Sequence, residues 1–327
     1  MTRIRVKKAL ITGITGQDGY YLTRLLLEKG YQVYGIARDP LKIDISLVTD
    51  IEEIFQIDLL EPEGLIDVIS SVAPDEIYHL AAHHFSSQTN QNRTGALDPF
   101  IRVNLIVVDQ ILQAISLKFP ETRFFYPASS HIFGTTKEVP QSEATVLNPE
   151  TSYAISKVAG LHLCRYYRNV HGIFSAVGIL YNHESPRRGS SFITTKIARA
   201  AALASLGQAE QLMVHNMDAI VDWGAAQDYV RAMWLMLQRN TAEEYVVASG
   251  TGRTVRDFAR QAFASVGISA EDLVLQDPVG GHAAKVPMVG DSTKLRRKAG
   301  WQVDISFEAM VAAMVTEQQR VLQQGSA

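Results

Sequence analysis

The first half of the chain alternates short apolar runs with helical patterns. Apolar and β-branched residues dominate positions 6–12, 32–37, 53–57, 76–80 and 123–128, and each run predicts a strand. Apolar residues at helical spacing predict helices over 20–29, 63–72 and 99–117, with Gly30 as the cap that ends the first. This order of strands and helices predicts an α/β fold built on a doubly wound parallel sheet, which binds ligands at the carboxyl ends of its strands.

The second half carries apolar stripes over 225–237, 255–266 and 307–321, which predict further packing helices. The composition is 46% hydrophobic and 20% charged, with a net charge of -3, so neither a nucleic-acid partner nor a disordered acidic chain is indicated. No membrane partner is expected, because no long apolar run or signal-peptide pattern is visible. Cys164 is the only cysteine, which excludes an internal disulfide and fits a cytoplasmic protein. The expected partner is a small molecule.

A glycine-rich loop separates the first predicted strand from the first helix. Gly13, Gly16 and Gly19 lack Cβ atoms, so their backbone amides can approach a pyrophosphate at the helix N-terminus. The spacing is one residue longer than the commonest dinucleotide fingerprint, and a loop that merely turns the chain is the alternative. The strand before the loop and the helix after it favour a bound dinucleotide.

Other strand ends suggest further ligand contacts. Arg38 after the second strand could hold the 2′-phosphate of NADP, whereas the neighbouring Asp39 could accept the ribose hydroxyl of NAD. We expect NADP, with NAD as the alternative. Three histidines near the fourth strand could suggest a metal, but no carboxylate stands at ligand spacing beside them, so no metal is expected. These histidines are His79, His83 and His84.

Tyr153 and Lys157 stand four residues apart, on one face of a predicted helix. A lysine beside a tyrosine stabilises the phenolate, and a phenolate can take a proton from a sugar or alcohol hydroxyl. An ordinary amphipathic helix would show the same spacing by chance. Ser129, Ser130 and His131 follow the fifth strand, where this fold places its chemistry, although serines also cap strand ends. The polar segment 85–97 is a candidate active-site loop.

Together these motifs resemble the extended short-chain dehydrogenase/reductase family, and within it the GDP-mannose 4,6-dehydratases. The resemblance runs over nearly the whole chain and is most specific in the Asn-His-Glu-Ser-Pro-Arg-Arg-Gly block, residues 182–189. It also includes the glycine loop, the Tyr153–Lys157 motif and Asp222-Trp223-Gly224. It implies a Rossmann-type NADP-binding domain over 1–179 and a smaller C-terminal α/β substrate domain over 180–327, with some chain crossing back. It also implies a homodimer formed through two helices per subunit.

The resemblance implies a nucleotide-sugar 4,6-dehydratase that works through transient oxidation at C4. Tyr153, Lys157, Ser129, Ser130 and His131 would form the catalytic group, with His131 at the position of the family's glutamate base. The implied substrate residues are Asn182, Glu184, Arg187, Arg188 and Lys196. The implied cofactor-binding residues are Thr12, Gly13, Gly16, Gln17, Asp18, Gly19, Arg38, Asp58, Leu59, Leu80, Ala81, Ala82, Tyr153 and Lys157.

Departures from the family pattern keep two alternatives open. His131 in place of glutamate is compatible with a C4 epimerase or 4-ketoreductase of a related nucleotide sugar. Val221 replaces an arginine that grips the diphosphate in the family, and residues 282–289 lack an expected arginine and glutamate. A dinucleotide-binding protein without turnover is therefore a further alternative. Possible substitute cations are Arg187, Arg188, Lys196 and Arg199.

Overall fold

A parallel sheet of seven strands forms the larger part of the structure, which is a computed structural model that describes residues 5–47, 49–83, 97–277 and 286–325. Within these residues its strand order is β10-β6-β5-β4-β1-β2-β3, and every neighbouring pair is parallel. The order reverses direction at β1, as in doubly wound sheets, so the predicted fold class is confirmed. The strands are β1 Lys8–Thr12, β2 Gln32–Ala37, β3 Glu53–Gln56, β4 Glu76–His79, β5 Arg123–Ser129, β6 Ser175–Leu180 and β10 Glu244–Val247.

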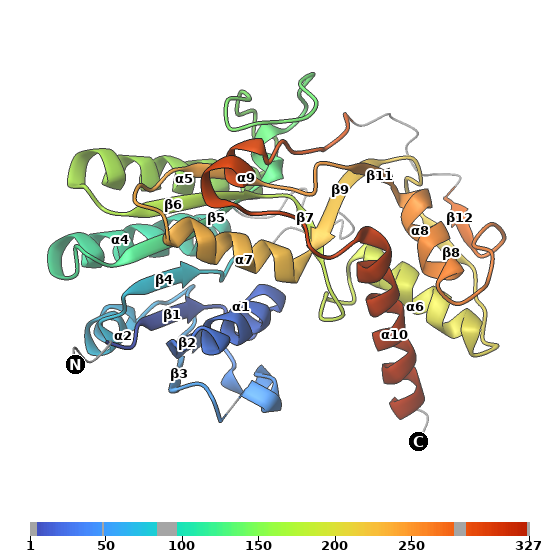
Figure 1. The fold of residues 1–327 in the computed structure, drawn as a ribbon, viewed down its shortest axis with the longest axis horizontal. Coiled ribbons are helices and arrows are strands. Elements are labelled where there is room, and N and C mark those ends of the chain that lie inside the picture. The colour runs from blue at the N-terminus through green and yellow to red at the C-terminus, as the bar shows by residue number, and fades with distance from the viewer. Residues whose placement is uncertain (1–4, 48, 84–96, 278–285, 326–327) are drawn as a thin grey trace.

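Helices cover this sheet in two groups (Figure 1). One group contains α2, α4 and α5, and the other contains α1 and α7, with α9 against β10. Every residue of β4 and β6 is buried, so both faces of the sheet are covered. The helices are α1 Gln17–Glu28, α2 Leu65–Val72, α4 Val107–Lys118, α5 Ser152–His171, α7 Ala226–Leu237 and α9 Thr293–Ala299.

The predicted helix over 99–117 is divided in the structure. It consists of α3 (Asp98–Ile101), a π-helical turn (Arg102–Ile106) and α4. At the π-turn the Asn104 carbonyl accepts a hydrogen bond from the Tyr126 hydroxyl at 3.1 Å. A Cβ on Gly160 of α5 would lie 2.2 Å from that hydroxyl and 2.9 Å from the Asn104 oxygen. The glycine therefore lets α5, β5 and the π-turn meet closely.

A smaller part lies beside the large sheet (Figure 1) and has its own apolar core. It contains a three-stranded sheet of β11 (Gly252–Thr254), β9 (Ile220–Ala225) and β7 (Asn182–Glu184), and the strand pair β8 (Leu212–Val214) and β12 (Val274–Gln276). Its helices α6 (Ile193–Ser205), α8 (Val255–Ala264) and α10 (Phe307–Gly325) pack on one another. The chain crosses between the cores, because α7, β10 and α9 follow residue 180 and pack in the first core.

Most predicted elements are present with shifted ends. The first strand starts at Lys8 rather than residue 6, because Val6 is exposed, and α1 starts at Gln17 rather than residue 20. Gly30 follows the end of α1 with φ +77°, the left-handed conformation that glycine tolerates best. Of the candidate loop over 85–97, residues 85–96 lie outside the described residues, as does His84.

Within the described residues, Asp98–Lys118 is the one helical run long and apolar enough to cross a membrane. Half of its apolar window is buried inside the protein, where it packs against α2 and α5, and such burial is typical of a core helix. Exposed apolar side chains remain on this run and on α5, among them Leu117, Ile155 and Val170. The homodimer implied by the family resemblance stays a prediction.

Candidate active site

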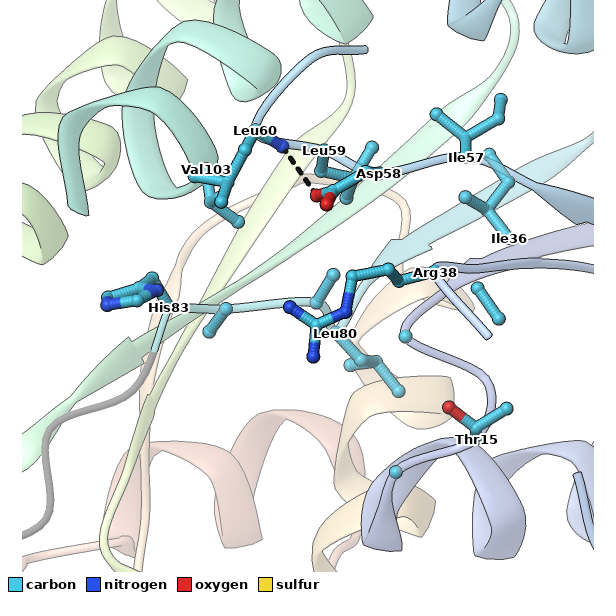
Figure 2. Close-up of a pocket in the computed structure, with 15 residues that line it drawn as sticks. Thr15, Ile36, Arg38, Ile57, Asp58, Leu59, Leu60, Leu80, His83 and Val103 are labelled. Carbon is cyan, nitrogen blue, oxygen red and sulfur yellow. Dashed lines mark hydrogen bonds between the residues drawn. The ribbon is translucent and has the colours of Figure 1, made fainter. Parts of the chain in front are cut away.

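A pocket of about 320 Å³ opens at the carboxyl ends of β1, β2 and β4 (Figure 2). The structure brings most of the predicted cofactor residues together here. The lining includes Gly13, Gly16, Arg38, Asp58, Leu59, Leu80, Ala81 and Ala82 from that prediction, together with Thr15, Ile36, Ala37, Ile57, Leu60, His83 and Val103. The pocket therefore occupies the edge where a doubly wound sheet binds its ligands.

The glycines of the loop are required by close backbone contacts. Gly13 has φ +72°, and a Cβ there would lie 2.7 Å from the backbone nitrogen of Ala81. A Cβ on Gly19 would lie 2.5 Å from the Ile14 oxygen. Gly16 is the N-cap residue of α1 and no side chain caps this end, so the amides of the first turn can serve an anion. This tight, uncapped cradle fits the pyrophosphate of a dinucleotide.

Arg38 and Asp39 have different surroundings. The Arg38 side chain extends into the pocket, with Asp58 on one side and Thr15 on the other (Figure 2). Asp39 instead accepts a hydrogen bond from the Leu41 amide at 3.2 Å and pairs with Lys42 at 3.4 Å. It caps the short 3₁₀ turn Pro40–Lys42. The arginine is therefore the member of the pair that faces the pocket.

Thr12 and His79 support the pocket from beneath. The Ala81 amide donates to the Thr12 hydroxyl at 3.2 Å, and that hydroxyl is 3.0 Å from His79 Nδ1. His79 Nε2 is 3.2 Å from the Val103 carbonyl, which can only accept, so Nε2 is the protonated nitrogen. Burial lowers the pKa of His79 to about 3, so the ring is neutral. Thr12 is fully buried, and its hydroxyl holds the Ala81 backbone in place.

Both ring nitrogens of His79 thus have partners within the protein. Among the described residues, no group of three histidine, cysteine, aspartate or glutamate side chains could hold a metal ion. His83 lies at the pocket wall, where its ring meets Phe100 edge-on at 4.8 Å.

The candidate catalytic side chains meet where β5 ends and α5 begins. Thr151 caps α5 by accepting from the Ala154 amide at 3.1 Å, which sets Tyr153 in the first turn of the helix. Ser129 ends β5, and its hydroxyl accepts from the His131 amide at 3.3 Å. The His131 and Tyr153 rings lie 6.1 Å apart and nearly perpendicular. His131 is exposed and faces the tyrosine, whereas Ser130 is buried.

The ionisation of Tyr153 and Lys157 differs from the sequence-based expectation. Burial raises the pKa of Tyr153 to about 12, although a hydrogen bond with Ser129 opposes the change. Burial lowers the pKa of Lys157 to about 7, and its side chain is only 1% exposed. The Lys157 Nζ lies 5.1 Å from the Tyr126 ring centre and 5.7 Å from that of Tyr153. Burial therefore dominates the pKa of both side chains, in contrast to the expected stabilisation of the phenolate by Lys157.

Asn104 is a candidate residue that the sequence reasoning did not identify. It is fully buried at the π-turn, and its Nδ2 donates to the Ser156 hydroxyl at 3.0 Å. The Ser156 hydroxyl donates in turn to the Tyr153 carbonyl at 2.8 Å. The Asn104 Oδ1 has no hydrogen-bond partner among the described residues. In the sequence, the signal for Asn104 was a polar amide within the apolar pattern of 99–117. Its place at the π-turn supports a functional role, because π-turns are frequent at functional sites.

Several predicted substrate residues are already paired within the protein. Glu184 is 1% exposed and contacts Thr194 and Arg188, each at 3.0 Å, so its carboxylate has partners within the protein. Burial raises the pKa of Glu184, although Arg188 opposes that change. Arg187 pairs with Asp44 at 2.6 Å and covers the Tyr20 ring at 3.9 Å.

Other predicted substrate residues are more accessible. Asn182 is partly exposed in β7, and Lys196 is exposed on α6. Val221 is partly buried and packs against the second core, opposite Arg253 in the neighbouring strand β11. Gln17 and Asp18 do not line the pocket; their side chains contact residues 183–185 of the smaller part.

Comparisons with known proteins agree with this architecture. The sequence profile of the family described as GDP-mannose 4,6 dehydratase matches residues 10–314. GDP-mannose 4,6-dehydratase of Yersinia enterocolitica is 36% identical, over 95% of this chain and 93% of its own. GDP-mannose 4,6 dehydratase 2 of Arabidopsis thaliana is 37% identical, over 95% and 86% respectively.

Solved structures share the fold at lower identity. RMD from Pseudomonas aeruginosa, complexed with NADPH, superimposes with a TM-score of 0.80 at 23% identity, covering 97% of this chain and 98% of its own. UDP-glucose 4-epimerase of Thermotoga maritima gives 0.84 at 19% identity, covering 96% and 99%. The fold and motifs place the chain among the extended short-chain dehydrogenases/reductases, as predicted. Because the family profile spans nearly the whole chain, the protein belongs to the GDP-mannose 4,6-dehydratase family.

The Lys157→Met variant lacks the buried amine and therefore tests how ionisation of Lys157 affects stability. Because the pKa is about 7 in the folded state and ordinarily 10.5, the unfolded chain binds more protons between these values. Stability of the dinucleotide-free protein should therefore rise with pH from about 7 to 9.5, by up to roughly 1.4 kcal/mol per pH unit. The variant should be more stable than the parent at pH 6.5, and its free energy of unfolding should not show this rise with pH. Urea unfolding at several pH values measures the effect, and equal slopes in both proteins would contradict it.

Proposed function

We propose that this protein is a nucleotide-sugar 4,6-dehydratase that acts on GDP-mannose or a close relative. Membership of the GDP-mannose 4,6-dehydratase family carries the proposal. The meeting of Ser129, Tyr153 and His131 at the carboxyl end of β5, in the sheet whose other strand ends hold the dinucleotide-type pocket, supports it. The comparisons do not favour the epimerase or ketoreductase alternative.

The residues fit distinct proton-handling roles. Tyr153 would accept the proton of the C4 hydroxyl, and Ser129, already hydrogen-bonded to Tyr153, would orient that hydroxyl. A nicotinamide dinucleotide bound in the pocket would supply reversible hydride transfer and, when oxidised, a positive charge that favours the Tyr153 phenolate. Once C4 is a ketone, the C5 proton is acidic, and the exposed His131 would remove it. The resulting imidazolium would protonate the C6 hydroxyl as it leaves as water.

Product mass tests the function directly. The purified protein with its copurified dinucleotide should convert GDP-mannose to a product lighter by one water, without added cofactor. Tyr153→Phe should abolish this conversion while the protein remains folded. Mass spectrometry against a panel of sugar nucleotides measures it. Epimerisation at unchanged mass, or consumption of added NADPH, would refute the dehydratase proposal.

His131 is expected to act only after C4 oxidation. His131→Ala should lower exchange of the C5 proton with solvent by about 100-fold or more, the usual scale for a lost general base, while C4 oxidation continues. His131→Glu supplies the family's carboxylate and should retain exchange, which controls for folding. Deuterium incorporation from heavy water, read by mass spectrometry, measures the step. Persistent exchange in His131→Ala would show that another group is the base.

We further propose NADP as the preferred dinucleotide, because Arg38 enters the pocket while Asp39 caps the Pro40–Lys42 turn. Arg38→Ala should weaken NADP binding by about 10-fold or more, the scale of one charge-assisted hydrogen bond, and leave NAD binding nearly unchanged. Lys42→Ala removes a nearby cation that is paired with Asp39 and serves as the control. Isothermal titration of the stripped protein measures both affinities. An equal loss for NAD and NADP would rule out a 2′-phosphate contact.

A further inference from the structure

Side-chain contacts outside the proposed chemistry join β7 and the residues after it to the cofactor side. The Ser185 hydroxyl donates to Gln17 Oε1 at 2.7 Å, and Gln17 Nε2 donates to the His183 carbonyl at 3.1 Å. His183 Nε2 lies 2.9 Å from the Asp18 carboxylate. Gln17 and Asp18 belong to the first turn of α1, directly after the glycine loop. The substrate-side segment is thus attached to the element whose N-terminus faces the pocket.

The partners of His183 determine its protonation. Its Nδ1 lies 2.8 Å from the Tyr181 carbonyl, and its Nε2 faces the Asp18 carboxylate. A carbonyl and a carboxylate can only accept, so both ring nitrogens must donate and the ring is an imidazolium. The ring also stacks on Tyr229, with 4.5 Å between centres, which suits a cation.

The surrounding charges give this ion pair a defined pH range. Burial alone would lower the pKa of His183, but Asp18 and the hydrogen bonds raise it overall, against repulsion from Arg188. Glu184, itself paired with Arg188, is a further carboxylate close to the ring. Burial would raise the pKa of Asp18, yet His183 lowers it overall. The pair is therefore formed from below pH 3.8 to above pH 6.5, and it is lost as pH rises through the raised pKa of His183.

The position of His183 connects this pair to the substrate side. Successive side chains of a strand point to opposite faces, so His183 lies on one face of β7 and Asn182 and Glu184 lie on the other. Glu184 continues the connection to Thr194 at the start of α6. A rigid attachment at His183 therefore fixes the orientation of both flanking side chains and of the α6 N-terminus.

We propose that His183, as an imidazolium paired with Asp18, is a positioning residue that fixes the substrate-side strand β7 on the first turn of α1. The proposal rests on the proposed function, because it assigns β7 to the nucleotide-sugar side. His183 touches no reacting atom in it. Its loss should therefore change the KM for the nucleotide sugar more than kcat.

Direct observation of the ring tests the charge without turnover. In protein labelled with ¹⁵N-histidine, the ring of one of the nine histidines should titrate at a pH above the ordinary histidine value of 6.5. That signal should vanish in His183→Gln, and in Asp18→Asn it should titrate at a lower pH than in the parent. The exposed His162→Gln on α5 is the matched control and should leave it unchanged. A signal that survives His183→Gln, or a His183 that titrates no higher than an ordinary histidine, would overturn the proposal.

Kinetics then separate positioning from a purely structural role. In the parent holoenzyme, the KM for GDP-mannose should rise as pH passes the pKa of His183 measured by the titration. In His183→Gln, KM should be raised about 10-fold or more at pH 7, the scale of a lost charge-assisted hydrogen bond, with kcat changed only a few-fold and no such rise with pH. An unchanged KM, or an unchanged pH dependence, would refute positioning. If GDP-mannose is not turned over at all, the proposed function fails, while the titration still decides the charge of His183.

Discussion

Burial of the Lys157 amine is the constraint around which the larger part of the structure is arranged. The side chain is 1% exposed, and burial lowers its pKa to about 7. It reaches this position because α5 lies close against β5, which requires Gly160 at the contact with Tyr126. The same close contact brings the Tyr126 hydroxyl to the carbonyl of Asn104 at the π-turn. The first turn of α5, with Tyr153, is thereby held at the end of β5, beside Ser129.

His79 and His183 show how the surroundings of a histidine decide whether its ring is charged. His79 lies against a hydroxyl and a carbonyl in the buried sheet, and burial keeps it neutral. His183 is also surrounded by protein, but one of its nitrogens faces the carboxylate of Asp18. Opposite charge then offsets the cost of burial, because a paired ion loses less free energy on leaving water. One histidine supports the pocket as a neutral link, and the other joins the two parts of the molecule as a cation.

Much of the fold could be predicted from sequence, since its strands are β-branched runs between clear turn signals. The pocket followed from strand ends, because a doubly wound sheet brings those ends to one edge. The π-turn could not be predicted, because it depends on Tyr126 and Gly160, which are distant in sequence. The pairing of Glu184 with Arg188 and Thr194 was missed for a related reason. A motif shows which residues recur together, but not whether they contact a ligand or one another.

Val221 stands where the family resemblance implies an arginine that contacts a diphosphate. Its side chain packs against the second core, so restoring an arginine there would place a charge beside apolar residues. Of the possible substitutes, Arg187 and Arg188 are engaged by Asp44 and Glu184. Lys196 and Arg199 are exposed on α6, three residues apart and hence on one face. Both side chains belong to α6, the helix whose start is tied through Glu184 to β7 and His183.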